Sequence, residues 1–197
     1  MIDPDIIDIL AGIGEDSPLA IIRDRKPVTR QQAQWSYRAL FEPLESGHVT
    51  IQERFALATF VAGLHEQEEP RAFYAVGLSA TAPSKAFIAA LSAEISRGRA
   101  TGPYGAYPKG PLSVEDLAGP TYSVAQPAVL GARLSAAMAH VHMLVFHPRD
   151  ASAASLQTLL DAGWSNAGIV TISQLVAFLA FQIRVAAGLR TLAATGA

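Results

Sequence analysis

Helix start signals recur along the whole chain, whereas the alternating pattern of a strand hardly appears. Proline is favoured at the first position of a helix, and an acidic or hydroxyl side chain just before it can cap the helix. Asp3-Pro4 therefore predicts a short helix that ends at about Ala11, and Ser17-Pro18 predicts another. The chain is expected to be all-α.

Two pairs of residues have the spacing of a capping box, in which a threonine oxygen accepts a backbone N–H and the later side chain reaches back. The pairs are Thr29 with Gln32 and Thr50 with Glu53. The helix after Thr50 is apolar almost all round, so we expect it at the centre of the core. Pro70 is expected to break or restart this helix.

Further helices are predicted from prolines, caps and apolar residues at helical spacing. They are a helix that starts at Pro83, a helix from about Pro127 to Phe146, a helix from Ser152 to Ala162 that stops at Gly163, and a long helix from Asn166 to about Ala194. An uncharged run from Ala162 to Ile183 is about as long as a membrane span. Its polar residues and glycines favour a buried helix of a soluble bundle instead.

Glycine and proline are concentrated between Gly98 and Pro127, so no regular helix is expected there. This connection also contains Tyr104, Tyr107 and Tyr122. The three tyrosines can form a lid over a ligand, or they can pin the connection to the body of the protein. The sequence leaves both interpretations open.

Composition excludes several classes of function. The chain has 197 residues, with 15 basic and 17 acidic side chains and no cysteine. Without cysteine there is no disulfide, no thiol peroxidase chemistry and no cysteine-ligated zinc or iron–sulfur cluster. The near-neutral charge, without a basic stripe, argues against nucleic acid as a partner. The N-terminus has no cationic stretch before an apolar one, so a cytoplasmic protein is expected.

A weak internal repeat aligns Arg54 with Arg133, because similar patterns of apolar and small residues follow each of them. The segment from Leu156 to Leu192, with Gly163 as a helix stop inside it, resembles the carboxymuconolactone decarboxylase-like repeat. That superfamily includes alkylhydroperoxidase D-like proteins and peroxidase-related proteins with two such repeats in one chain. The resemblance covers about residues 49 to 192.

The resemblance implies a fold and an assembly. Residues 49–197 are expected to form an alkylhydroperoxidase D-like helical bundle of two related halves, with residues 1–48 as a helical extension packed on it. Relatives usually assemble as homo-oligomers, so a dimer or a trimer of dimers is implied, in agreement with the low content of charged residues. Neither nucleic acid nor a membrane is expected as a partner.

In redox-active members of the family, the capped helix runs into a Cys-x-x-Cys pair, with a glutamate before the pair and a histidine after it. Carried over from the capping box, the resemblance places other residue types at all four positions. These are Phe55 at the glutamate, Gln67 and Pro70 at the cysteines, and Tyr74 at the histidine. The resemblance therefore supports the fold and argues against the peroxidase activity.

The segment from His65 to Pro70 is the densest cluster of ionisable side chains, and it lies at the family's active-site position. His65 with Glu68 or Glu69 on one helix face can bind a divalent metal or act as an acid/base pair, and a solvated helix end is the alternative. We expect no resident metal and no cofactor. The expected catalytic residues are His65, Glu69 and Tyr74, and the expected ligand-binding residues are Gln67, Gln174 and Tyr104.

Polar residues also occur on the apolar C-terminal helix, where buried polar groups need partners. Gln174, Gln182 and Arg184 can bond to a neighbouring helix or subunit, or they can line a pocket and orient a polar ligand. Three histidines on the helix predicted to end at Phe146, or directly after it, are expected to be structural, because a lone histidine on an apolar helix is usually a satisfied core residue. They are His140, His142 and His147.

The expected function is that of a cysteine-free relative that is not a thiol peroxidase. It is a non-redox acid/base enzyme or small-molecule binder that uses the inherited pocket for cofactor-free lyase or isomerase chemistry, such as lactone decarboxylation or isomerisation. The alternative is a catalytically silent structural or regulatory subunit that partners an active peroxidase-like oxidoreductase.

Overall fold

The computed structural model describes residues 5–195, and within that range the protein is all-α, as the sequence predicts. Ten α-helices and two short 3₁₀ helices form, and no strand forms among the described residues. The elements are α1 Ile6–Ala11, α2 Pro18–Asp24, α3 Pro27–Phe41, α4 Ile51–Leu64, α5 Glu68–Ala80, α6 Lys85–Gly98, η1 Pro111–Glu115, α7 Pro127–Leu130, α8 Ala132–Phe146, η2 Pro148–Asp150, α9 Ala153–Asp161 and α10 Asn166–Ala194.

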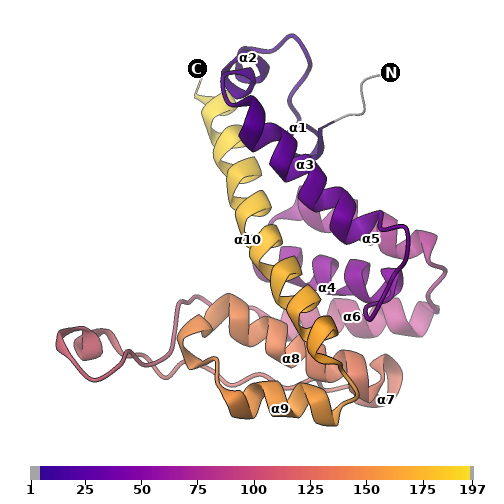
Figure 1. The fold of residues 1–197 in the computed structure, drawn as a ribbon, viewed down its shortest axis with the longest axis vertical. Helices are drawn as coiled ribbons and strands as arrows, with labels where there is room; N and C mark the ends of the chain where they lie inside the picture. The colour runs from indigo at the N-terminus through magenta and orange to yellow at the C-terminus, as the bar shows by residue number, and fades with distance from the viewer. Residues whose placement is uncertain (1–4, 196–197) are drawn as a thin grey trace.

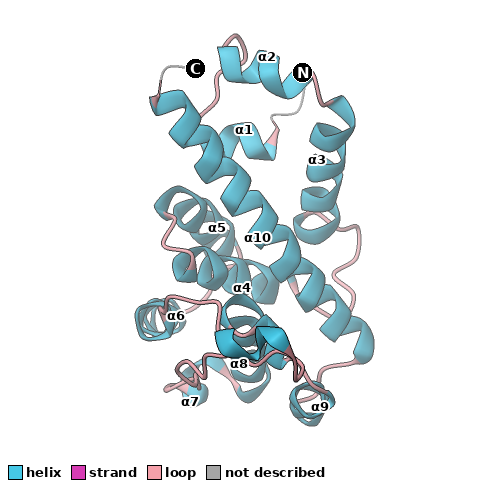
Figure 2. Ribbon diagram, turned by 90° about the vertical axis from the view of Figure 1, so that its left-hand side faces the viewer, coloured by secondary structure: helices cyan, strands magenta, loops and turns pink. Residues whose placement is uncertain are grey.

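The long helix α10 runs along the molecule and connects its two ends (Figure 1). It packs against α1 and α3 near its C-terminus, against α4 in the middle, and against α8 and α9 nearer its start (Figures 1 and 2). Helix α4 contacts α5, α6, α8 and α10, and most of its side chains are buried. The prediction that α4 lies at the centre of the core is therefore confirmed.

The apolar core has two parts. The larger part surrounds α4 and includes the fully buried side chains of Leu57, Phe60 and Leu175. The smaller part joins α1 to α3 and α10, and it consists of Ile6, Ile7, Leu10, Ala11, Ala33 and Ala186. Burial of these side chains is the main force that holds the N-terminal helices on α10.

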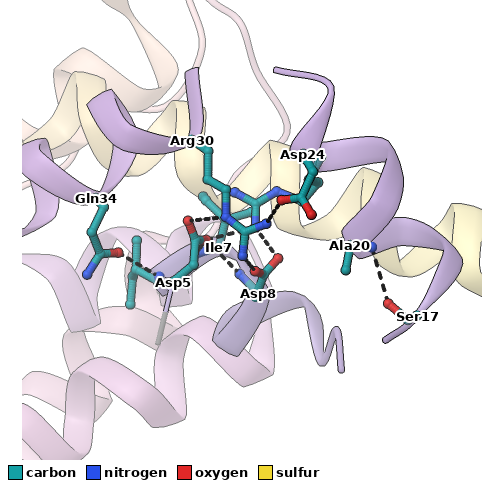
Figure 3. A network of polar contacts seen from close by, with 10 residues as sticks. Asp5, Ile7, Asp8, Ser17, Ala20, Asp24, Arg30 and Gln34 are labelled. Carbon is teal, nitrogen blue, oxygen red and sulfur yellow. Dashed lines mark hydrogen bonds and ion pairs between the residues drawn. The ribbon is translucent and has the colours of Figure 1, made fainter. Parts of the chain in front are cut away.

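An ion network ties the first three helices together (Figure 3). Asp5 caps α1, because its carboxylate accepts the N–H groups of the first helical turn at 2.9 and 3.1 Å. Arg23 of α2 pairs with Asp5 at 2.8 Å and with Asp8. Arg30 of α3 also pairs with Asp8 and, at 2.6 Å, with Asp24. The network therefore fixes α1, α2 and α3 relative to one another.

Two arginines, at the positions that the internal repeat aligns, fix the segment before α4. Arg54 is buried and donates to three backbone carbonyls, at the end of α3 and in the following loop, over 2.8, 2.9 and 3.0 Å. Arg133 of α8 donates to the carbonyls of His48 and Gly163 and to the Glu53 carboxylate. Both side chains therefore hold the start of α4 in place.

Two predicted helix starts are confirmed and one is wrong. The Ser17 hydroxyl caps α2, and Thr50 with Glu53 forms the capping box of α4. Thr29 lies inside α3, because that helix already starts at Pro27. Proline has a fixed φ and no N–H, so it begins the helix without a side-chain cap.

Other predicted boundaries shift. Helix α4 ends before Pro70, at a turn in which Glu66 has a φ of 54°, and Pro70 lies in the first turn of α5. The single helix predicted from Pro127 is wrong, because Gly131 with a φ of 84° separates α7 from α8. Asp3 and Pro4 lie outside the described residues, and the start of α1 follows Asp5.

By length and composition, α10 could cross a membrane, and it alone passes this test among residues 5–195. It is partly buried against α1, α3, α4 and α8.

Candidate functional site

A cavity of about 740 Å³ lies between the ends of α4 and α8, the middle of α10, and the start of the connection between α6 and α7. We call it the α10 pocket. Apolar side chains form much of its wall, and a few polar groups face into it. Its lining includes Leu64, His65, Pro103, Phe146, Ser173 and Arg184. A largely apolar cavity with few convergent polar groups is the usual form of a small-molecule site.

His65 is the first polar group of the pocket. It directly follows α4, and its backbone N–H donates to the carbonyl of Val61 at 3.0 Å, which closes the last turn of the helix. Its ring atom Nε2 is buried and has no hydrogen-bond partner among the described residues. Burial, and then the positive charge of Arg184, lower the pKa of His65 from 6.5 to about 4. The imidazole is therefore neutral at pH 7.

Arg184 supplies the positive charge of the pocket. It lies on α10, and its Nη1 donates to the carbonyl of Ala180 in the same helix at 3.1 Å. Within residues 5–195, no carboxylate pairs with it, although Glu66 also lines the cavity. An exposed guanidinium beside a neutral imidazole can bind an anion and leave a proton acceptor next to it.

Ser173 and His140 form a second polar group, farther towards the start of α10. The Ser173 hydroxyl lines the pocket, donates to the carbonyl of Ile169 at 2.9 Å and lies 3.5 Å from Nε2 of His140. Burial lowers the pKa of His140, and its Nδ1 has no partner in the described part of the chain. His140 is thus not the fully satisfied core histidine that the sequence predicts.

The other two histidines do have partners. Nε2 of His142 lies 2.9 Å from the carbonyl of Gly98, and His147 lies between the Asp150 carboxylate and a backbone carbonyl, each at 3.1 Å. Both histidines are buried. Their contacts fit the structural role that the sequence predicts.

The predicted site residues Glu69 and Gln67 lie outside the α10 pocket. The Glu69 side chain is 62% exposed and pairs with Arg190 at 3.6 Å. Gln67 accepts a hydrogen bond from Arg190 at 2.5 Å. The assumption that His65 shares one helix face with Glu68 and Glu69 is wrong, because α4 ends before His65 and α5 starts at Glu68. No group of three metal-ligating side chains forms among the residues described.

Tyr74 and Gln174 are also separated from His65. Tyr74 is fully buried in the core, where its hydroxyl donates to Gln182. Gln182 therefore bonds to a neighbouring helix, one of the two alternatives left open by the sequence. Gln174 is exposed and lines a different cavity, of about 470 Å³, next to Arg54. The structure thus assigns Gln182 to packing and Arg184 to a pocket.

Tyr104 and Tyr122 anchor the connection, and neither of them lines the α10 pocket, so the prediction that Tyr104 binds the ligand there is wrong. Tyr122 donates to the buried carboxylate of Glu94 at 2.9 Å, and its ring stacks on His142 with 4.5 Å between ring centroids. The backbone N–H of Tyr104 donates to the carbonyl of Phe146 at 2.6 Å. Its ring packs against Gly119, where a φ of 63° and the close approach of the ring leave no room for a side chain. These contacts pin the connection beside the pocket, while the segment around η1 projects away from the bundle (Figure 1).

Comparisons of the chain with protein-family profiles, with curated proteins and with solved structures find no match. The role of the α10 pocket is therefore argued from the side chains that line it. Sequence reasoning found His65, and it left open whether Arg184 lines a pocket. It missed Ser173, although the spacing of residues 173, 177, 180 and 184 already indicates one helix face.

Proposed function

We propose that the protein binds a small carboxylate in the α10 pocket and transfers a proton to and from it, with His65 as the proton acceptor. The observation that carries this proposal is the buried, unpartnered Nε2 of His65 beside the guanidinium of Arg184. The reaction class is cofactor-free isomerisation or decarboxylation of a carbon acid, which needs acid/base groups and no thiol.

Arg184 would hold the carboxylate. A guanidinium forms two parallel hydrogen bonds with a carboxylate, so it fixes the orientation of the ligand as well as its position. The apolar wall formed by residues such as Leu64 and Phe146 lies beside this ion pair and gives the hydrocarbon part of the ligand a surface to pack against. A carbon of the chain attached to the bound carboxylate then comes close to His65.

Binding itself would activate His65. The charge of Arg184 is one of the two causes that lower the pKa of this imidazole. A bound carboxylate compensates that charge, so the proton affinity of His65 rises when the substrate is present. The base is therefore neutral in the free protein and stronger in the complex.

The resemblance to carboxymuconolactone decarboxylase-like proteins agrees with this proposal, since decarboxylation in that superfamily needs no redox cysteine. We also propose a homo-oligomer, which is supported by exposed apolar side chains on α3 and α10. These are Val28, Trp35, Val170, Phe181 and Leu192. A silent subunit of an oxidoreductase is the alternative that the following experiment separates.

The test is hydrogen exchange of levulinate, a carboxylate with acidic methylene protons next to its ketone. The protein is incubated with it in deuterated buffer, and NMR measures deuterium uptake at that methylene. We expect wild type to accelerate the exchange and His65→Gln to reduce the acceleration by about a hundredfold or more, the usual contribution of a general base.

His48→Gln is the matched control, because His48 is an exposed histidine that does not line the pocket. It should exchange levulinate at the wild-type rate. Exchange at the buffer rate with wild type, at concentrations where levulinate is bound, would contradict the catalytic proposal and favour the silent-subunit alternative.

A further inference from the structure

One face of α10 forms the floor of the pocket. The residues of this face that line the cavity are Ser173, Val176, Ala177, Ala180 and Arg184. Their spacing of three and four residues places them on a single helix face. From Ser173 to Arg184 the helix advances by about 16 Å, at about 1.5 Å per residue. The floor is therefore long, with a polar residue at each end.

The middle of this floor is apolar. Val176, Ala177 and Ala180 offer no hydrogen-bonding side chain, and Leu144 and Phe146 of α8 lie on another wall of the cavity. The volume of about 740 Å³ falls in the range of cavities that hold drug-sized ligands. A carboxylate with a very short chain would leave most of this apolar surface in contact with water.

The end of the floor at Ser173 is built to accept a hydrogen bond. The Ser173 hydroxyl already donates its proton to Ile169, so only its lone pairs are free. Nδ1 of His140 has no acceptor nearby among the described residues, which favours the tautomer with the proton on Nε2, facing Ser173. One lone pair of the hydroxyl then remains for a ligand group that donates, such as an alcohol.

We infer that the α10 pocket takes an elongated amphiphile: a medium-chain carboxylate with a hydroxyl at its far end, the carboxylate on Arg184 and the hydroxyl on Ser173. This inference rests on the proposed function, because the same guanidinium holds the carboxylate. It adds to the proposed function the length of the substrate chain and a hydroxyl at the end away from the carboxylate.

The experiment is titration calorimetry of the full chain with propionate, decanoate, ω-hydroxydecanoate and decanol. Decanoate should bind on the order of a hundredfold more tightly than propionate, since several more methylene groups become buried. The ω-hydroxyl should add about fivefold. Decanol, which has no carboxylate, should bind at least about tenfold more weakly than decanoate.

Two variants separate the two ends of the ligand. Ser173→Ala should remove the advantage of the ω-hydroxyl and leave decanoate binding unchanged. Arg184→Gln should weaken propionate and decanoate by the same factor. Ser96→Ala is the matched control, because Ser96 also donates to a backbone carbonyl one turn earlier but lies on α6, outside the pocket. It should leave every affinity unchanged.

The outcomes distinguish this inference from the proposed function. Propionate binding that depends on Arg184, with decanoate no tighter, overturns the elongated ligand and leaves the proposed function standing. An ω-hydroxyl advantage that is absent, or that survives Ser173→Ala, overturns the assignment of the far end. Binding of carboxylates that does not depend on Arg184 contradicts the proposed function and this inference together.

Discussion

Replacing Arg54 by alanine is expected to lower the free energy of unfolding by about 4 kcal/mol. Arg54 is 6% exposed, and its guanidinium donates to the backbone carbonyls of Leu40, Ser46 and Val49. Without it, these buried acceptors lose their partner, and a cavity opens beside α4. Burial lowers the pKa of Arg54, and among the described residues the partners of its guanidinium are backbone carbonyls. Chemical denaturation followed by circular dichroism measures the loss.

Arg25→Ala is the control for Arg54, because Arg25 is an exposed arginine whose side chain has no hydrogen bond to any of residues 5–195. Its substitution should change the free energy of unfolding by less than about 0.5 kcal/mol. If Arg54→Ala were as mild as this control, the role given to Arg54 in fixing the start of α4 would be wrong.

Glu94→Ala is expected to cost about 3 kcal/mol in unfolding free energy and to weaken carboxylate binding in the α10 pocket. The Glu94 carboxylate is fully buried and accepts from the Tyr122 hydroxyl, the Ala125 N–H and Arg97, at 2.9, 2.8 and 2.7 Å. Burial and the neighbouring carboxylate raise the pKa of Tyr122, so its hydroxyl is a neutral donor. Removal of Glu94 leaves these three donors without their acceptor and releases the connection from α6.

The effect on binding has a structural reason. The connection that Glu94 anchors also supplies Gly102 and Pro103 to the pocket wall. Tyr122→Phe removes only one of the three donors, so it should cost about 1 kcal/mol and leave binding close to wild type. Thermal unfolding and propionate titration of both variants measure these quantities. A Glu94→Ala protein with wild-type stability would show that the connection is held by other contacts.

Local signals predicted much of the fold. Ser17 and Thr50 cap helices as expected, since a side-chain cap depends on only a few neighbouring residues. The errors arose where two signals compete. Pro27 begins α3 ahead of Thr29, and a glycine with a positive φ interrupts the helix predicted from Pro127. Sequence spacing alone does not show which of two neighbouring signals sets the start or the end of a helix.

The candidate site was harder to predict, because it depends on contacts between distant segments. His65 was found because it lies in the densest cluster of ionisable side chains, whereas its neighbour Arg184 comes from the far end of the chain. Tyr74 was expected beside His65, yet it faces Gln182 in the core. The direction in which one side chain of a helix points depends on where the neighbouring helices pack, and the order of the helices around α4 cannot be read from residue spacing.

The pKa of His65 also affects stability. The ordinary value is 6.5 and the value in the folded protein is about 4, so between these pH values the unfolded chain binds a proton that the folded protein does not. Acidification across this interval therefore favours unfolding, and the stability associated with His65 is fully present only above about pH 6.5.

The most direct test of the proposed site is an NMR titration of the His65 ring, with and without propionate. We expect a pKa of about 4 in the free protein. Bound propionate should raise it, because the carboxylate compensates the charge of Arg184, and Arg184→Gln should raise it without any ligand. A pKa of about 6.5 in the free protein, unchanged by propionate and by Arg184→Gln, would contradict the account of the α10 pocket.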